Sequence, residues 1–321
     1  MASQLPLFPS GIFHSEPLGA ECDRYLAALL APQSRIGYGF EWRMFVAWAG
    51  EHGRCPLPAS RDTVTLFLAD GLNKGLKVST VRRRLHAIAY EQRRHGFDRW
   101  DHSACLMLLR GAQRTKAERP RRMVPLTIAQ LREISIKLGA SRRPAAVRDR
   151  ALMLLGFTSA LRSVSLAELA LDDVEFSTEG LVLTIRREKQ DQEARGRYIG
   201  IPLGKYPTTC ASQALRAWLD VRGETGTREI FIRRCRHRGA LPMASKTVCA
   251  VVKRSVAHIG LNPSHYGAHS LRSGFITAAG EAGLSDLLIA AHSGHRDMDC
   301  LRTYFRRSNV FRANACAALD L

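Results

Sequence analysis

The 321-residue chain lacks the patterns that would tie it to a membrane or to an oxidising compartment. Its apolar runs stay below the roughly 18 residues of a membrane span, and its first residues do not form a signal peptide. None of its eight cysteines belongs to a Cys-x-x-Cys pair, and their spacing suits neither a disulfide framework nor a zinc knuckle. We therefore expect reduced thiols and a cytoplasmic protein.

Acidic residues are scarce beside the basic ones. The chain has 29 Asp and Glu against 48 Lys and Arg, which gives a net charge of +19. Such a surplus favours a polyanion, above all nucleic acid, as the partner, although a merely soluble basic surface is the plainer alternative. We also see no acidic grouping near the histidines that would hold divalent metals, so we expect chemistry without a metal.

The N-terminal part shows helical spacing. Residues 1–20 are rich in Pro, Gly and Ser and predict a loose arm, whereas 21–115 predict a compact bundle of four or five short helices. One of these helices opens near Ser79 and carries a run of cations away from its apolar stripe. A solvated face is the usual meaning of such a run, but its recurrence one or two turns later favours a phosphate-binding surface. The cations are Arg82, Arg83, Arg84, Arg93 and Arg94.

A basic linker over 116–126 separates this bundle from a second domain over 127–321. It contains Arg119, Arg121 and Arg122 and could cross a nucleic-acid backbone. The second domain opens on a capping-box pattern, Thr127-x-x-Gln130. Two β-rich runs, 181–185 and 197–201, predict a hairpin that carries Lys189. The remaining periodicity predicts helices over about 127–138, 145–159, 211–221, 245–258, 269–281, 285–292 and 298–307, and one ending at Asp172-Asp173. The predicted class is mainly α with a small antiparallel β-sheet (α+β).

The last fifty or so residues hold the groups with the clearest chemistry. A phenol has a pKa of about 10 and is a poor nucleophile, but beside cations and hydrogen-bonding groups it can attack a phosphodiester. Arginines suit the phosphate oxygens, because their forked donors match them. Tyr304 alone could equally be a packed aromatic, and the histidines His265, His269, His292 and His295 could be a metal cluster. The candidate catalytic set is Arg162, Lys189, His269, Arg272, His295 and Tyr304.

Five motifs in this order resemble the tyrosine recombinase (phage integrase) family. They are Gly156-Phe-Thr-Ser-Ala-Leu-Arg162, Arg-Arg-Glu-Lys189-Gln-Asp-Gln, His269-Ser-Leu-Arg272-Ser-Gly, Gly294-His295, and Tyr304 nine residues later. The segment Thr80-Val-Arg-Arg-Arg-Leu-His-Ala-Ile resembles the family's core-binding domain. The resemblance implies a two-domain, C-shaped DNA clamp, with a helical (SAM-like) core-binding domain and a C-terminal catalytic domain.

The resemblance also implies roles for the candidate residues. Tyr304 would attack the scissile phosphate, forming a 3′-phosphotyrosine and releasing a 5′-hydroxyl. Arg162 and Arg272 would hold the phosphate oxygens, and His295 would donate to the same phosphate. His269 would move the tyrosine proton, and Lys189 would protonate the leaving oxygen. No cofactor, metal or ATP is implied.

Two positions depart from the family pattern. Many members carry a carboxylate three residues after the first arginine, where this chain has Ser165; the nearest acid is Glu168. His292 is an additional histidine, which we interpret as a half-buried helix residue.

Family members work as homo-tetramers on two double-stranded DNA sites, exchanging strands through a Holliday junction. We expect the same here, in association with the bacterial nucleoid. The weakly amphipathic tail from Val310 to Leu319 is expected to dock on a neighbouring protomer. Integration, excision and resolution of a mobile element all stay open. A cleavage-inactive DNA-binding accessory protein and a type IB topoisomerase are the alternatives.

Overall fold

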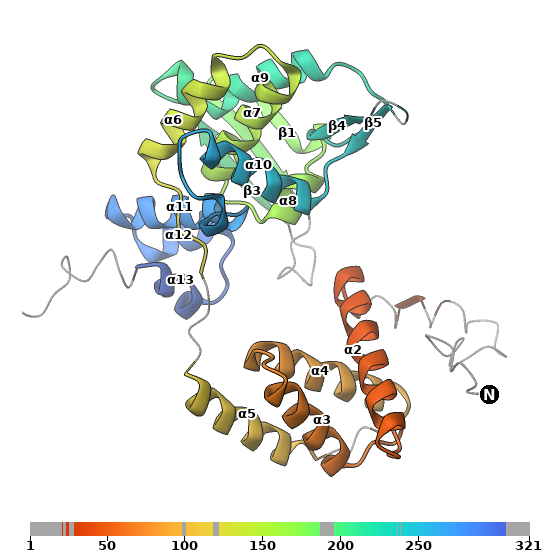
Figure 1. The fold of residues 1–321 in the computed structure, drawn as a ribbon. Helices are drawn as coiled ribbons and strands as arrows, with labels where there is room; N and C mark the ends of the chain where they lie inside the picture. Colours follow the sequence, from red (N-terminus) through yellow and green to blue (C-terminus); the bar gives the residue numbers. More distant parts are fainter. Residues whose placement is uncertain are drawn as a thin grey trace, which may run out of the picture. The chain divides into compact units, whose positions relative to one another are not determined.

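The fold was obtained as a computed structural model (Figure 1). It describes residues 29–97, 101–117, 122–186, 196–235 and 239–305, together with Glu21, Arg24, Tyr25 and His237. The chain divides into two compact units, residues 1–121 and 122–321. The expected arm at 1–20, Lys189 and the tail beyond 305 lie outside the described residues.

The first unit is a helical bundle. Its apolar core is centred on Phe45, Phe67, Leu68, Leu85 and Ile88, all at most 2% exposed. A Ser60 hydroxyl accepts the Thr63 backbone N–H and caps one of the helices. The described helices are α2 (Pro32–Glu51), α3 (Arg61–Asn73), α4 (Val78–Arg94) and α5 (Ser103–Lys116).

One of the cations predicted to face outward on α4 instead packs inside the first unit. Glu41 of α2 is 2% exposed, and both Arg83 and Arg84 donate to its carboxylate. The Arg84 side chain is 13% exposed and lies over the Phe67 ring, 4.9 Å from its centroid. Arg84 therefore holds α2 and α3 against α4. The prediction that Arg84 binds phosphate is wrong, because its side chain is engaged inside the unit. Arg82, Arg83 and Arg93 stay exposed, although Arg83 also pairs with Glu41.

Replacing Glu41 with alanine should destabilise the first unit by about 3 kcal/mol, because it leaves the Arg84 guanidinium buried without its counter-charge. Amide hydrogen exchange of α2 and α4 would measure the loss. Glu51→Ala at the exposed end of α2 is the matched control and should change protection by less than about 0.5 kcal/mol. Equal protection in the two variants would contradict a structural role for the Glu41 pair.

The second unit wraps helices around one large apolar core. The predicted capping box is present, with the Thr127 hydroxyl and the Gln130 amide each accepting the other's backbone N–H. Trp218 of α9 (Ala211–Arg222) closes the core and donates its indole N–H to the Ile230 carbonyl at 2.9 Å. The helices are α6 (Ile128–Gly139), α7 (Pro144–Thr158), α8 (Ser163–Glu168), α9 (Ala211–Arg222), α10 (Ser245–Ala257), α11 (His269–Glu281), α12 (Asp286–Ser293) and α13 (Met298–Phe305), with short 3₁₀ turns at 171–173, 207–209 and 263–265.

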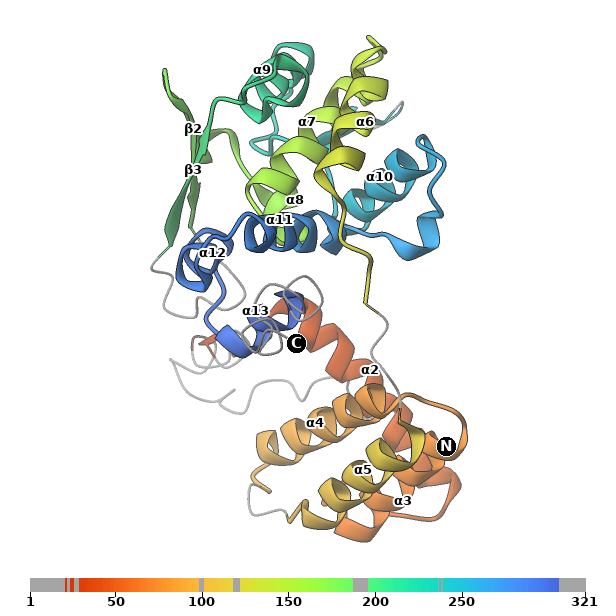
Figure 2. The same ribbon diagram turned by 90° about the vertical axis from the view of Figure 1, so that its left-hand side faces the viewer.

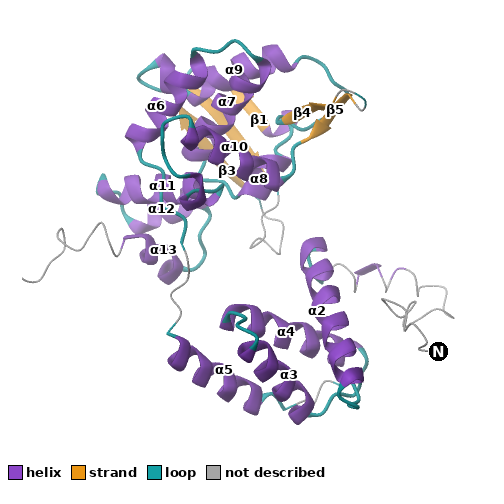
Figure 3. Cartoon of the chain, viewed as in Figure 1, coloured by secondary structure: helices purple, strands orange, loops and turns teal. Residues whose placement is uncertain are grey.

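All the described strands lie in this second unit (Figure 3). The predicted hairpin is confirmed as β2 (Gly180–Ile185) and β3 (Arg197–Pro202), antiparallel with Leu183 opposite Ile199. Two features differ from the prediction of a single hairpin. A short strand, β1 (Val174–Phe176), adds to β2, and β4 (Ile232–Cys235) pairs with β5 (Gly239–Pro242) as a second sheet. The helix that was predicted to end at Asp172-Asp173 ends earlier, at Glu168, and a 3₁₀ turn follows it.

The C-terminal helices α11, α12 and α13 pack together beside the main core (Figures 1 and 2). Gly274 allows the segment before α6 to cross α11 closely, since a Cβ there would lie 2.2 Å from the Leu126 carbonyl oxygen. The same segment is held by backbone hydrogen bonds from Val124 to His265 and from Leu126 to Ser270. Residues 122–126 of the predicted linker therefore pack with the second compact unit, which starts at Arg122. Within the described residues, no helix is long and apolar enough to cross a membrane.

Candidate active site

The tyrosine predicted as nucleophile meets one of the predicted histidines directly. The hydroxyl of Tyr304 on α13 lies 2.7 Å from Nε2 of His269, the first residue of α11. Half-buried Tyr304 packs on the small apolar cluster that joins α11, α12 and α13. Its ring also meets that of His295 edge-on at 5.9 Å between centroids. An imidazole nitrogen is thus placed to exchange a proton with the phenol.

Arg272 is the buried centre of the site. Its side chain is 1% exposed, and Nη1 donates to the carbonyls of Ala160 at 2.7 Å and Ser293 at 2.6 Å. Nη2 lies 3.1 Å from both ring nitrogens of His295. A nitrogen at this distance from both ring nitrogens sits over the ring face, because an in-plane position would overlap the Cε1 atom between them. Arg272 therefore ties α11, the turn after α7 and the end of α12 into one arrangement.

The Gly294-His295 turn brings His295 back onto α12. Gly294 has φ +69° and ends α12 in the left-handed conformation that favours glycine. Its N–H and that of His295 both donate to the Ala290 carbonyl. The reversal places Nδ1 of His295 2.7 Å from the Ser293 hydroxyl.

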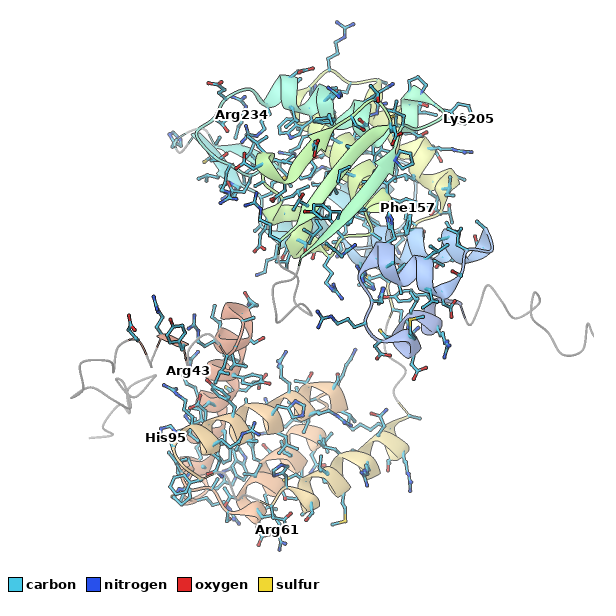
Figure 4. All side chains as sticks on the ribbon, turned by 180° about the vertical axis from the view of Figure 1, so that it is seen from behind. Arg43, Arg61, His95, Phe157, Lys205 and Arg234 are labelled. Atoms are coloured by element: carbon cyan, nitrogen blue, oxygen red, sulfur yellow. The ribbon has the colours of Figure 1, made fainter. Side chains whose placement is uncertain are left out.

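Arg162 follows a strained turn between α7 and α8. Ala160, which accepts the Arg272 hydrogen bond, has φ +51°, a conformation that costs a residue with a side chain about 1 kcal/mol. Two residues later Arg162 is the N-cap of α8. Its charge acts on both His269 and His295, so it belongs to the same electrostatic group. Phe157, labelled in Figure 4, anchors the preceding helix end against Phe275 of α11.

The electrostatics favour neutral forms of the three proton-carrying groups. Partial removal from water, with Arg272 and Arg162 nearby, lowers the pKa of His269 and lowers that of His295 to about 4. Removal from water also raises the pKa of Tyr304, although the arginines Arg272, Arg122 and Arg162 act in the opposite direction. Near neutral pH the site therefore holds two neutral imidazoles, a neutral phenol and fixed arginine charges.

The depressed pKa of His295 predicts a pH dependence of stability. The unfolded state binds a proton below about pH 6.5 and the folded state only near pH 4, so this residue costs stability progressively as the pH falls between them. His295→Gln should therefore lose less stability than the parent protein between pH 7.5 and pH 5 in thermal unfolding. His258→Gln, at an exposed position, is the control. Parallel pH profiles for parent and His295→Gln would contradict the assignment.

Five of the six predicted catalytic residues come together: Arg162, His269, Arg272, His295 and Tyr304. The sixth, Lys189, lies outside the described residues, as do Arg119 and Arg121. Exposed Arg122 is near enough for its charge to act on Tyr304. Arg82, Arg83, Arg93 and Arg94 belong to the other unit. The half-buried Arg94 pairs with Glu91.

Two further residues support the end of α12. Arg197, at the base of the β2–β3 hairpin, donates to the His292 carbonyl at 2.5 Å and to that of Ala291 at 3.4 Å. His292 stacks on Phe275 at 4.5 Å and hydrogen-bonds through Nε2 to the Thr158 carbonyl. The sequence shows Arg197 only as one of several hairpin cations, because its contact is made nearly a hundred residues away.

The expectation that no acidic pair lies near the histidines is wrong, because Asp297 and Asp299 form an Asp-x-Asp pair just after His295. Asp297 accepts the backbone N–H groups of Asp299 and Cys300. Among the described residues, no three His, Cys, Asp or Glu side chains gather as metal ligands would. The β4–β5 hairpin carries Arg233 and Arg234, the latter labelled in Figure 4. In the sequence, the run Arg-Arg-Cys-Arg-His-Arg indicates this cationic hairpin.

Known proteins with similar sequences and folds are recombinases and integrases. The chain is 29% identical over 310 residues, 95% of this chain and 90% of the relative, to an integrase/recombinase xerD homolog of Selenomonas ruminantium. Its fold is similar to a Tn1549 transposon integrase in complex with transposon right end DNA (TM-score 0.61, 16% identity, 92% of this chain and 98% of that one). It is also similar to the XerH site-specific recombinase bound to difH substrate in a post-cleavage complex (TM-score 0.59, 16% identity, 80% and 72%).

The match to a family model covers the second unit. The model described as "Phage integrase family" matches residues 125–309, more than half of the chain. The matched range contains all six predicted catalytic residues, and the described five of them meet around Tyr304. The chain belongs to the phage integrase family, the family of the tyrosine recombinases.

Proposed function

We propose that the protein is a site-specific DNA recombinase that cuts and rejoins DNA strands through a 3′-phosphotyrosine. The observation that carries this is the 2.7 Å contact between the Tyr304 hydroxyl and Nε2 of His269, beside buried Arg272. A phenol with a raised pKa needs a base to become a nucleophile, and a lowered histidine pKa leaves that base unprotonated. Strand exchange would proceed through a Holliday junction, with the protein in the DNA-containing compartment, on the nucleoid.

In this proposal the cleavage step assigns one role to each of the six candidate residues. The Tyr304 O–H bond breaks, its proton passes to His269, and the phenolic oxygen forms a bond to phosphorus. The bond from phosphorus to the 5′-oxygen breaks, and that oxygen takes a proton from Lys189. Arg162 and Arg272 hold the non-bridging oxygens, and His295 hydrogen-bonds the same phosphate. Rejoining is the reverse, with a 5′-hydroxyl attacking the phosphotyrosine, so neither ATP nor a metal is consumed.

The helical unit supplies binding energy in this proposal, as a core-binding domain, and residues 122–321 supply catalysis. Exposed Arg82, Arg83 and Arg93 on α4 would contact phosphates along the site. Arg94 would contribute less, because it is 21% exposed and pairs with Glu91. The linker cations, Arg119, Arg121 and Arg122, would contact the DNA backbone where the linker crosses it.

A suicide substrate tests the proposed activity. A duplex carrying the recombination site is nicked so that the cleaved end is lost, which leaves any protein–DNA link trapped. We expect a band that survives denaturation and is digested by protease. A protein that shifts the DNA without such a band is an accessory protein. A covalent band with relaxation of any supercoiled plasmid, and no recombination between sites, indicates a type IB topoisomerase.

Assembly into a homo-tetramer would use the tail beyond α13. The described chain ends at Phe305, beside α12, and an apolar groove of about 390 Å³ lies between β3, α11 and α12. Leu284 and Leu288 line this groove, and they are 49% and 62% exposed. The apolar residues of a neighbouring protomer's tail, Val310 to Leu319, are the occupant we propose.

Deleting residues 310–321 should therefore reduce synapsis at least about tenfold and change single-site DNA affinity by less than about twofold. Native gels of one-site and two-site complexes measure both quantities. Leu288→Ser should reproduce the synapsis defect if the groove receives the tail, while Leu203→Ser, an exposed leucine elsewhere on the unit, should not. Equal loss of synapsis and DNA binding would argue against docking.

A further inference from the structure

The buried hydroxyl of Ser293 lies between two hydrogen-bonding partners, a carbonyl oxygen and an imidazole nitrogen. Ser293 ends α12 and is 0% exposed. Its Oγ lies 2.5 Å from the Ile289 carbonyl oxygen and 2.7 Å from Nδ1 of His295. The Ser293 carbonyl accepts from Arg272, so the residue is fixed on both its main-chain and side-chain sides.

Counting protons decides the direction of these bonds. A hydroxyl has one proton, and a carbonyl oxygen can only accept. Two oxygens 2.5 Å apart need a proton between them, so the Ser293 hydroxyl donates to Ile289. Its oxygen then accepts, and the donor at 2.7 Å is an N–H at Nδ1 of His295.

The other neighbours of His295 do not reverse this choice. Arg272 from α11 lies over the ring face and offers only donors, so it supplies no acceptor for a proton at either nitrogen. Arg162 at the start of α8, His269 on α11 and Arg197 on β3 all act against a second proton on the ring. Tyr304 of α13 meets the ring edge-on. In the free protein the imidazole is therefore neutral and carries one proton, on either Nδ1 or Nε2.

We propose that Ser293 is a positioning residue that holds His295 as the Nδ1–H tautomer, so that Nε2 enters the reaction without a proton. This rests on the proposed function and deepens it. A bare Nε2 cannot donate to a phosphate oxygen. When the DNA phosphate enters the site, its negative charge offsets the arginine charges. His295 therefore takes up one proton from solvent. The resulting imidazolium donates from Nδ1 to Ser293 and from Nε2 to the phosphate.

Nitrogen chemical shifts of the imidazole in ¹⁵N-histidine-labelled free protein test the tautomer without any cleavage assay. At pH 7.5 we expect His295 to show a protonated Nδ1 and an unprotonated Nε2. Ser293→Ala should move the proton toward Nε2, and Ser293→Thr, which keeps a hydroxyl able to bond the i−4 carbonyl, should not. A protonated Nε2 in the parent protein would overturn the proposal. The parent spectrum stays decisive if Ser293→Ala fails to fold.

Two functional readouts separate positioning from mere packing. Suicide-substrate cleavage should fall about tenfold in Ser293→Ala, because the imidazolium loses the acceptor of its Nδ1 proton, and should recover in Ser293→Thr, with DNA affinity unchanged within about twofold. Calorimetry at pH 6 in buffers of different ionisation enthalpy should show proton uptake on DNA binding that is smaller in His295→Gln. Equal uptake in both proteins would overturn the imidazolium step. If no covalent band forms while the tautomer is as expected, the proposed function fails and the tautomer assignment stands.

Discussion

Tyr304→Phe is expected to abolish the covalent protein–DNA band, a loss of at least about a thousandfold, while DNA affinity changes by less than about twofold. The variant keeps the ring that packs against α11 and α12 and removes only the oxygen that contacts His269. Phenylalanine has no nucleophilic atom, so neither the tyrosyl ester nor the 5′-hydroxyl can form. Denaturing gels of trapped suicide substrate measure the covalent product, and gel shifts measure the affinity.

Two other tyrosines provide matched controls for this variant. Tyr198 is 77% exposed on β3, and Tyr266 is 6% exposed before α11. Tyr198→Phe and Tyr266→Phe should both keep the covalent band, because neither hydroxyl contacts His269. A band that persists in Tyr304→Phe, or disappears in Tyr198→Phe, would move the nucleophile elsewhere and would remove the basis of the proposed mechanism.

Arg272→Lys is expected to reduce cleavage about a hundred- to a thousandfold even though it keeps a positive charge. The guanidinium satisfies the Ala160 and Ser293 carbonyls and covers His295 at the same time. A single ammonium group cannot reach all three and still present a donor to phosphate. Single-turnover cleavage of the suicide substrate at saturating protein measures the chemical step separately from binding.

Arg302→Lys serves as the control for this charge-conserving change. Arg302 is 61% exposed on α13, and within the described part of the chain it pairs with the surface carboxylates of Asp286 and Asp299. Its replacement should leave cleavage within about threefold, since exposed ion pairs contribute little. Comparable rates for Arg272→Lys and Arg302→Lys would show that the buried geometry of Arg272 is not required for phosphate activation.

Regular periodicity allowed most of the helices to be predicted. The capping box at Thr127 and the alternating run at 181–185 were sufficient local signals, and both are confirmed. The β4–β5 hairpin was missed because its strands are only four residues long, and β4 carries two arginines that hide any alternation. The three residues of β1 are equally short, and β1 depends on pairing with β2.

Arg84 shows how a run of like charges conceals differences in environment. It stands three residues after Val81 and four before Ile88, which places it over the apolar stripe of α4 rather than opposite it. That spacing was visible in the sequence. Its buried partner Glu41 was not, because the two lie 43 positions apart on different helices. Exposed Arg82, Arg83 and Arg93 stay candidates for phosphate contact.

The candidate site was predictable in its members but not in its internal bonding. Family motifs supplied Arg162, His269, Arg272 and Tyr304 by type and order. The carbonyls of Ala160 and Ser293 that fix Arg272 carry no signal, because any residue has a carbonyl. The Ser293 hydroxyl becomes meaningful only once the Gly294 turn returns His295 to it.

The segment from Arg122 to Leu126 carries a mechanical consequence. Through Val124 and Leu126 it is hydrogen-bonded to the turn and first residues of α11, the helix that bears His269 and Arg272. This segment is also the part of the chain that connects directly to the helical unit. The path of this segment before α6 therefore sets the position of the backbone that carries Arg272 and of His269, the residue that contacts Tyr304.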